Sequence, residues 1–155
     1  IVEKALTDFR EINCACIKLG DKYLVSECEE PMTSGEILSF SDKYSGERKA
    51  VFPAELDGKT ASKIKDLTSY IYRKLEFSGA VRIDYLLDGE KIYVNEINSV
   101  PGSLAYYLFV DSIGEFRDLL LRSIELAEEE ESDRENNVYT YSSNVLSLDS
   151  EKLRK

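Results

Sequence analysis

Three oxygen-bearing side chains in the stretch VRIDYLLDGEKIYVNEINSVPGS, residues 81 to 103, could together hold a divalent cation. Asp84 belongs to one segment with strand-like alternation, and Glu96 and Asn98 belong to the next. Two carboxylates and an amide oxygen, with no histidine or thiolate among them, suit Mg²⁺ or Mn²⁺ better than zinc. Because Mg²⁺ usually completes its shell with substrate phosphates, this donor set predicts a nucleotide ligand.

Whether these side chains meet depends on the loop between the two predicted strands. A two-residue turn at Asp88-Gly89 would send Asp84 to one face of the hairpin and Glu96 to the other. A loop of odd length, or a bulge, would bring Asp84, Glu96 and Asn98 onto one face. The alternative is that all three are ordinary solvent-facing residues of an antiparallel hairpin.

The motif RIDYLLDGEKIYVNEINSVPG resembles the metal-binding hairpin of ATP-grasp enzymes, and most closely that of D-alanine–D-alanine ligases. The resemblance implies that Asp84, Glu96 and Asn98 hold two Mg²⁺ ions on the phosphates of ATP. It also implies that Arg82 and the backbone N–H of Gly102 stabilise negative charge on a tetrahedral intermediate. Such donors, aimed at developing oxyanion charge, are a common source of catalytic power.

The same resemblance implies further contacts with ATP. In the opening segment IVEKALTDFR it implies that Glu3, Lys4 and Leu6 contact adenine, and at the start of the next strand that Glu11 holds the ribose. The sequence SDKY is a shortened match to a family loop whose lysine meets the phosphates, which implies this role for Lys43. The alternatives are a frayed edge strand for the first segment and a solvated surface lysine for Lys43.

One position departs from the family pattern. Five residues beyond the glycine, the family usually has a small hydroxyl residue that holds the substrate carboxylate, and this chain has Tyr107. The difference touches the substrate pocket and leaves the metal ligands unaltered. Which carboxylate and which amine are joined therefore stays open.

Composition narrows the classes of function. The chain has 155 residues, 43% hydrophobic and 32% charged, which is typical of a soluble globular protein, and no segment approaches membrane-spanning length. Its net charge of -10 repels polyphosphate backbones, so we expect no nucleic-acid partner. The absence of histidine excludes Ser-His and Cys-His nucleophile arrangements and most zinc sites.

The cysteines favour a reducing compartment. Cys14, Cys16 and Cys28 are odd in number, which excludes a complete disulfide framework, and Cys14 and Cys16 fall on one face of a predicted strand as small core residues. We therefore expect a cytoplasmic protein. The chain begins without methionine, and we expect it to be a fragment of a larger ligase.

The elements that must position these residues can be predicted from periodicity and turn signals. We expect a hairpin of residues 10–19 and 22–28, a short strand at 37–40, and a helix at 60–78 capped by Thr60 and ended by Gly79. A capping box at Ser112 and Glu115 predicts a second helix, which should run to about Glu130 and cover the sheet. Residues 138–148 are a weaker strand candidate.

Together these patterns predict an α+β fold, a largely antiparallel sheet flanked by helices, like the C-terminal subdomain of an ATP-grasp ligase. We expect residues 1–130 to form the ATP- and Mg-binding domain and 131–155 an acidic, weakly structured tail. The implied function is ATP-dependent carboxylate–amine ligation through an acyl phosphate, as in peptidoglycan precursor synthesis. With no G-x-x-x-x-G-K loop present, the fragment should be inactive without the N-terminal and central ligase domains. The alternatives are an ATP-grasp ligase with other substrates and a nucleotide-binding module without catalysis; the oligomeric state stays open.

Overall fold

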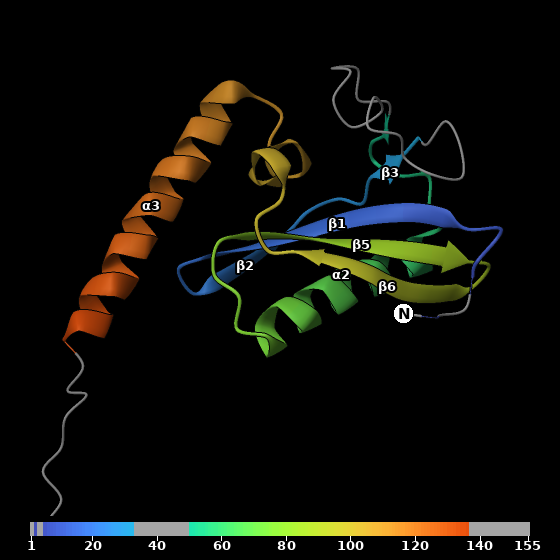
Figure 1. Cartoon of the computed structure of the whole chain (residues 1–155). Coiled ribbons are helices and arrows are strands. Elements are labelled where there is room, and N and C mark those ends of the chain that lie inside the picture. Colours follow the sequence, from blue (N-terminus) through green and yellow to red (C-terminus); the bar gives the residue numbers. More distant parts are fainter. Residues whose placement is uncertain (1, 3–4, 33–49, 137–155) are drawn as a thin grey trace, which may run out of the picture.

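The computed structural model describes residues 2, 5–32 and 50–136. Its centre is a four-stranded antiparallel sheet in the order β2-β1-β5-β6, as Figure 1 shows. The strands are β1 (Arg10–Leu19), β2 (Lys22–Val25), β5 (Ala80–Asp88) and β6 (Lys91–Asn98). The two long central strands, β1 and β5, have one face covered by a long helix. The opposite face, the open face, has a helix at one end in the described residues.

The predicted first hairpin is present. Its turn is Gly20-Asp21, with Leu19 paired to Lys22, and Gly20 has a positive φ of 65° that glycine adopts without steric cost. The second strand ends at Val25, three residues earlier than predicted. Beyond it the chain pairs with β1 again at an isolated antiparallel bridge between Asn13 and Glu29. It then enters β3 (Glu30–Pro31), which pairs with β4 (Ala50–Val51). The strand predicted at 37–40 lies outside the described residues.

The hydrophobic core lies between the sheet and the helix α2 (Gly58–Lys74). One face of β1 and β5 supplies Cys14, Cys16 and Ile83, each essentially inaccessible to solvent, so the prediction that these cysteines are core residues is confirmed. The helix contributes Ile64 with Thr68 and Tyr72. Hydrophobic periodicity alone missed the last two, whose hydroxyls are satisfied inside the core by other protein atoms.

The bounds of α2 differ from the prediction at both ends. Asp57, rather than Thr60, caps the start, because its side chain accepts hydrogen bonds from the backbone N–H of Lys59 and Thr60. The helix ends at Lys74, well before Gly79, and Glu76 takes the left-handed conformation with φ 52°. The predicted structural role of the helix, packing on the sheet that carries the candidate site, is confirmed.

In the part of the chain that the structure describes, the short 3-10 helix η1 (Gly102–Leu108) covers one end of the opposite face and packs Ala105 and Leu108 against Ala15 of β1. The chain then enters α3 (Ile113–Glu135), whose start has the predicted Ser112 capping box. The helix runs five residues past the predicted end. It buries none of its residues, so the expectation that it covers the sheet is wrong.

The strand predicted at 138–148, like most of the expected tail, lies outside the described residues. Within the described part of the chain, no helix is both long enough and apolar enough to cross a membrane.

Candidate functional site

A β-bulge in the second hairpin decides the geometry of the site. The turn is Gly89-Glu90, one residue later than predicted, because Asp88 pairs with Lys91. Without an irregularity this turn would pair Asp84 with Asn95. A register shift between Asp84 and Tyr85 leaves Asn95 without a partner, so that Asp84 pairs with Glu96 instead.

The shifted register brings the predicted residues together. Asp84 pairs with Glu96, Arg82 pairs with Asn98, and all four side chains lie on the face of the sheet opposite to α2. Of the two arrangements left open by the sequence, the structure shows the one that places the carboxylates on one face.

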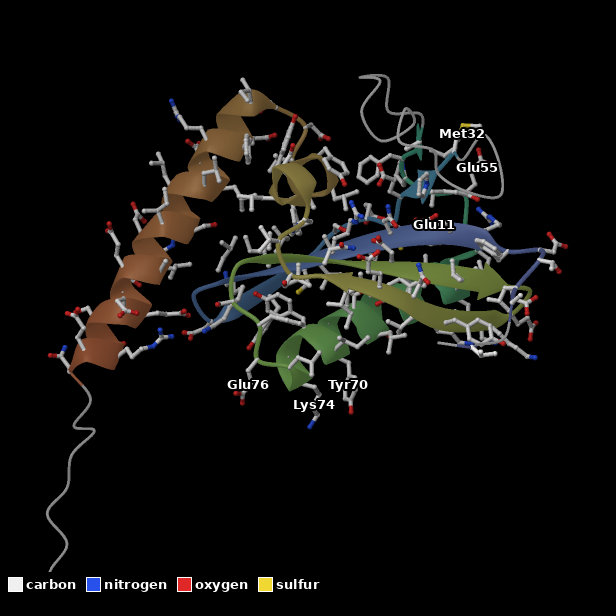
Figure 2. The ribbon with its side chains drawn as sticks, viewed as in Figure 1. Glu11, Met32, Glu55, Tyr70, Lys74 and Glu76 are labelled. Atoms are coloured by element: carbon white, nitrogen blue, oxygen red, sulfur yellow. The ribbon has the colours of Figure 1, made fainter. Side chains whose placement is uncertain are left out.

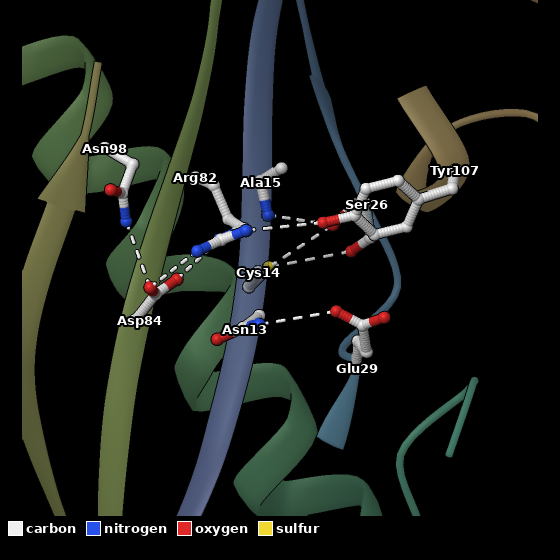
Figure 3. A network of polar contacts seen from close by, with 9 residues as sticks. All are labelled: Asn13, Cys14, Ala15, Ser26, Glu29, Arg82, Asp84, Asn98 and Tyr107. Carbon is white, nitrogen blue, oxygen red and sulfur yellow. Dashed lines mark hydrogen bonds and ion pairs between the residues drawn. The ribbon is translucent and has the colours of Figure 1, made fainter. Parts of the chain in front are cut away.

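Asp84 and Arg82 form a two-pronged ion pair within β5. Nε of Arg82 donates to Oδ1 of Asp84 at 2.7 Å and Nη2 donates to Oδ2 at 2.8 Å (Figure 3). The carboxylate is nearly buried, with 6% of its side chain exposed, and a buried charge of this kind needs a paired partner. Burial works to lower the pKa of Arg82, but the hydrogen bonds and charge of Asp84 outweigh it and raise the pKa above its ordinary value.

Asn98 also contacts Asp84, since its Nδ2 donates to Oδ2 at 3.0 Å. In the described part of the chain, no cluster of three or more His, Cys, Asp or Glu side chains could hold a metal ion. The predicted donor set has two such residues, Asp84 and Glu96, and an amide. Carboxylate and amide oxygens on one face fit a hard cation such as Mg²⁺, provided that the amide of Asn98 turns its oxygen toward the ion.

Glu11 lies on the same face, two residues from Asn13, which is the cross-strand partner of Asp84. Figure 2 shows Glu11 on the open face of the sheet, while Tyr70 and Lys74 project from α2 on the far side. Partial burial raises the pKa of Glu11, and the negative charge of Asp84 raises it further. The site therefore has a negative potential that extends from β5 across β1.

The 3-10 helix η1 forms the wall at the end of this face. Nη1 of Arg82 lies 3.4 Å from the hydroxyl of Tyr107, so the guanidinium is held between Asp84 and η1. Gly102 begins η1, and a Cβ atom at that position would have no neighbour within 4 Å. The backbone of Gly102 is therefore open to a ligand.

The remaining predicted contacts are only partly described. Leu6 is half-buried, and Glu3, Lys4 and Lys43 lie outside the described residues. Sequence reasoning missed Asn13 and Glu29, which are both buried on the open face beside the site, where Nδ2 of Asn13 donates to Glu29 at 3.3 Å. The available signal was the position of Asn13, which shares a face with Glu11 inside an otherwise apolar strand.

Known proteins with a similar sequence and fold belong to one family. Residues 1–116 match the family model described as the D-ala D-ala ligase C-terminus. A D-alanine–D-alanine ligase from Thermosipho africanus is 37% identical over 158 aligned positions, which cover 98% of this chain and 42% of the relative. The chain thus spans about two fifths of the length of that relative.

Two solved structures share the fold. The D-alanine–D-alanine ligase of Helicobacter pylori has a TM-score of 0.59 and 26% identity, with 79% of this chain and 32% of that chain covered. The VanG D-Ala:D-Ser ligase of Enterococcus faecalis has a TM-score of 0.51 and 27% identity, with 63% and 29% covered. The chain belongs to the D-alanine–D-alanine ligase family and corresponds to the C-terminal part of its members.

Proposed function

We propose that this chain is the part of an ATP-dependent carboxylate–amine ligase that holds the triphosphate with its divalent cations and stabilises the tetrahedral intermediate. The observation that carries the proposal is the bulged register, which gathers Arg82, Asp84, Glu96 and Asn98 on one face. In the reaction, a substrate carboxylate oxygen attacks the γ-phosphorus and ADP leaves. An amine then attacks the acyl phosphate carbon, and inorganic phosphate leaves as the amide bond forms.

The chain's own residues would divide the work by charge. Asp84, Glu96 and the amide oxygen of Asn98 would hold Mg²⁺ or Mn²⁺. When bound, these cations would neutralise phosphate oxygens and withdraw charge from the transferring phosphoryl group. Glu11 would accept hydrogen bonds from the ribose hydroxyls at the edge of the same face.

Arg82 and Gly102 would act on the acyl intermediate. The guanidinium is fixed before substrate binds, since Asp84 holds one edge and Tyr107 approaches Nη1. A donor held in this way loses little freedom when negative charge develops next to it, which is the condition for strong electrostatic stabilisation. The open backbone of Gly102 would supply a second donor from the end of the face.

The remaining predicted contacts complete the nucleotide site in this proposal. Glu3, Lys4 and Leu6 would contact adenine, and Lys43 would contact the phosphates. The N-terminal and central parts of the ligase, which the relatives contain, would supply the other wall of the site. By itself the chain should bind Mg-ATP weakly and should not turn over.

The relatives suggest the class of substrate, a carboxylate and an amine, and do not identify the two molecules. D-alanine is the substrate named for the Thermosipho and Helicobacter ligases, and VanG is named as a D-Ala:D-Ser ligase. Tyr107 contacts Arg82 from η1 and occupies space beside the acyl site. Its bulk favours a second candidate, a ligase whose carboxylate or amine substrate differs from D-alanine. Both reactions would consume ATP, and the first would supply a peptidoglycan precursor. We therefore expect the protein to act in the cytoplasm.

The first test is metal-dependent nucleotide binding. We expect calorimetry to show that the 155-residue chain binds ATP in the presence of Mg²⁺ and that Asp84→Asn and Glu96→Gln weaken this binding at least tenfold, because each removes a charged cation ligand. The matched control is Glu90→Gln, which removes a carboxylate from the exposed turn of the same hairpin. Circular dichroism should confirm that each variant is folded.

A phosphate-release assay on the same samples measures turnover, and its result is interpreted together with the binding data. Unchanged Mg-ATP binding by both variants would support a module whose nucleotide site lies elsewhere and would refute the assignment of this face. Robust turnover by the wild-type chain would refute the statement that the other ligase domains are required. Loss of binding in Glu90→Gln as well would show that net charge, and not the site, controls binding.

A further inference from the structure

Asn13 has a buried amide oxygen for which the described part of the chain offers no hydrogen-bond donor. The residue is 3% exposed, and among the described residues its Oδ1 accepts no hydrogen bond. Its backbone is fully used, because Asn13 N donates to the carbonyl oxygen of Glu29 at 2.8 Å and the carbonyl oxygen of Asn13 accepts from Glu29 N at 2.9 Å. A buried acceptor without a donor loses its hydration with nothing to replace it, so it is rarely left in a strand without a reason.

The orientation of the amide is set by its other end. Nδ2 donates to Oε2 of Glu29 at 3.3 Å, and turning the amide over would place two acceptor oxygens against each other. Figure 3 shows the result, with the nitrogen of Asn13 toward Glu29 and its oxygen on the side of β5. Asn13 is the cross-strand partner of Asp84, and side chains in such pairs are neighbours on one face. The free oxygen is therefore aimed into the site.

The charge around this oxygen selects the kind of donor it would accept from. Four carboxylates act on this region, those of Asp84, Glu96, Glu29 and Glu11, since the first three each raise the pKa of the fourth. Arg82 is the positive side chain that acts with them, and its guanidinium is already engaged by Asp84. An excess of negative charge with an unused neutral oxygen attracts a hydrated cation more strongly than it attracts an anion.

From this geometry we infer that Asn13 is a positioning residue for the divalent cation at Asp84, because its Oδ1 accepts a hydrogen bond from a water molecule of the cation's hydration shell. This rests on the proposed function, in which Asp84 is a cation ligand. Mg²⁺ keeps several of its waters in protein sites, and the partners of those waters fix the position of the ion. Glu29 acts through Asn13 by fixing which end of the amide faces the site.

The test is Mn²⁺ binding to the 155-residue chain, followed by electron paramagnetic resonance, with no nucleotide and no turnover required. We expect Asn13→Leu, which keeps the side-chain size and removes the oxygen, to weaken Mn²⁺ binding about tenfold, a typical loss for an outer partner of a metal site. Asn13→Asp combined with Glu29→Gln, which retains an oxygen toward the site and a donor opposite it, should keep or tighten the binding. The shift in Tm on adding Mn²⁺ should follow the same order, since a ligand stabilises the state that binds it.

The outcomes separate this inference from the proposed function. If Asn13→Leu binds Mn²⁺ as the wild type does while Asp84→Asn does not, the role of Asn13 is wrong and the cation site stands. If the wild-type chain binds no Mn²⁺ at millimolar concentration, both fail. If Asn13→Leu lowers the Tm without added cation but shows the same Mn²⁺-induced rise in Tm as the wild type, the role of Asn13 is purely structural and the inference is overturned. The control is Ser26→Ala. Ser26 is also buried and polar and accepts a hydrogen bond from Ala15 N of β1, so this variant measures how much a general loss of stability affects Mn²⁺ binding.

Discussion

The ion pair of Arg82 and Asp84 links the stability of the sheet to its chemistry. The two side chains lie on one strand, two residues apart, and each restricts the other through two hydrogen bonds. Removing one partner from a buried pair leaves an uncompensated charge and is strongly destabilising, by about 3 to 5 kcal/mol. A variant at either position therefore needs a fold control before any loss of binding is assigned to chemistry.

Glu11 gives a prediction about pH. Burial and the charge of Asp84 raise its pKa in the folded chain, so the folded state holds this proton more tightly than the unfolded state. The stability it contributes is full below the ordinary carboxyl pKa and is lost as the pH rises through the folded pKa. We expect Glu11→Gln to raise the Tm at neutral pH, with a difference from wild type that shrinks to zero as the pH falls below the ordinary pKa.

Thermal unfolding of the apo chain at a series of pH values checks this. Glu90→Gln, at the exposed turn, should show no such pH-dependent gain. A Glu11→Gln variant that is less stable than wild type at neutral pH would contradict the prediction.

At the scale of elements, the second hairpin and η1 build the site between them. The turn at Gly89 uses a positive φ of 59° at its first position, as type II′ turns do, and this fixes the start of the register. The bulge at Asn95 then corrects the face of Glu96. With this turn and no bulge, Asp84 would pair with Asn95 and the two carboxylates would lie on opposite faces, so the turn and the bulge set the face together.

Backbone strain is concentrated in η1, next to the face. Ser103, Leu104 and Ala105 all have φ between 51° and 54°, in the left-handed region that costs a non-glycine residue about 1 to 2 kcal/mol. The strained turn follows Gly102 directly and carries Tyr107 to Arg82. Strain of this kind often occurs where a binding site needs an unusual backbone.

Ser103 allows the strain to be measured, because its side chain is exposed and packs on little. We expect Ser103→Gly to raise the free energy of unfolding by up to about 1 kcal/mol, and Ser103→Val to lower it by about 1 to 2 kcal/mol, since a β-branched residue fits this region worst. Urea denaturation of the three proteins gives both values. Equal stability of the glycine and valine variants would show that the turn is not left-handed in solution.

At the scale of the whole molecule, the contacts are divided unevenly. The sheet and α2 enclose the core, while α3 buries no residue and leaves Ile113, Leu121 and Ile124 exposed. Its contacts with the rest include an ion pair between Lys18 and Glu130 and a stacked pair of Tyr106 and Phe116. A cavity of about 220 Å³ lies between the helix and the end of the β1-β2 hairpin.

This division predicts different local stabilities. We expect amide hydrogens of 113–135 to exchange with solvent much faster than those of α2, a helix with buried residues, because α3 can open without disrupting the core. Hydrogen exchange followed by mass spectrometry on the 155-residue chain measures both helices in one experiment. Equal protection of α2 and α3 would contradict the prediction and indicate that α3 packs on the core in solution.

Local sequence signals were enough to predict the main elements and the family. Alternation placed β1 and β5, the capping box placed the start of α3, and the motif from Arg82 to Gly102 identified the family, because these signals are local and each depends on residues a few positions apart. The helix α2 was predicted, but hydrophobic periodicity missed two of its buried residues, Thr68 and Tyr72. Each carries a hydroxyl group that is satisfied inside the core by hydrogen bonds to other protein atoms.

Which side chains meet depends on how the strands pair. A shift of one residue in pairing moves a whole strand to the other face, so the bulge at Asn95 could not be deduced from the pattern of Glu96 and Asn98 alone. The same holds for Asn13, whose importance depends on Glu29 and Asp84, brought to it by two different strand pairings. The strand register decides which side chains share a face of this sheet. That register depends on the turn, the bulge and the neighbouring strands together, and the residue pattern along one strand does not contain it.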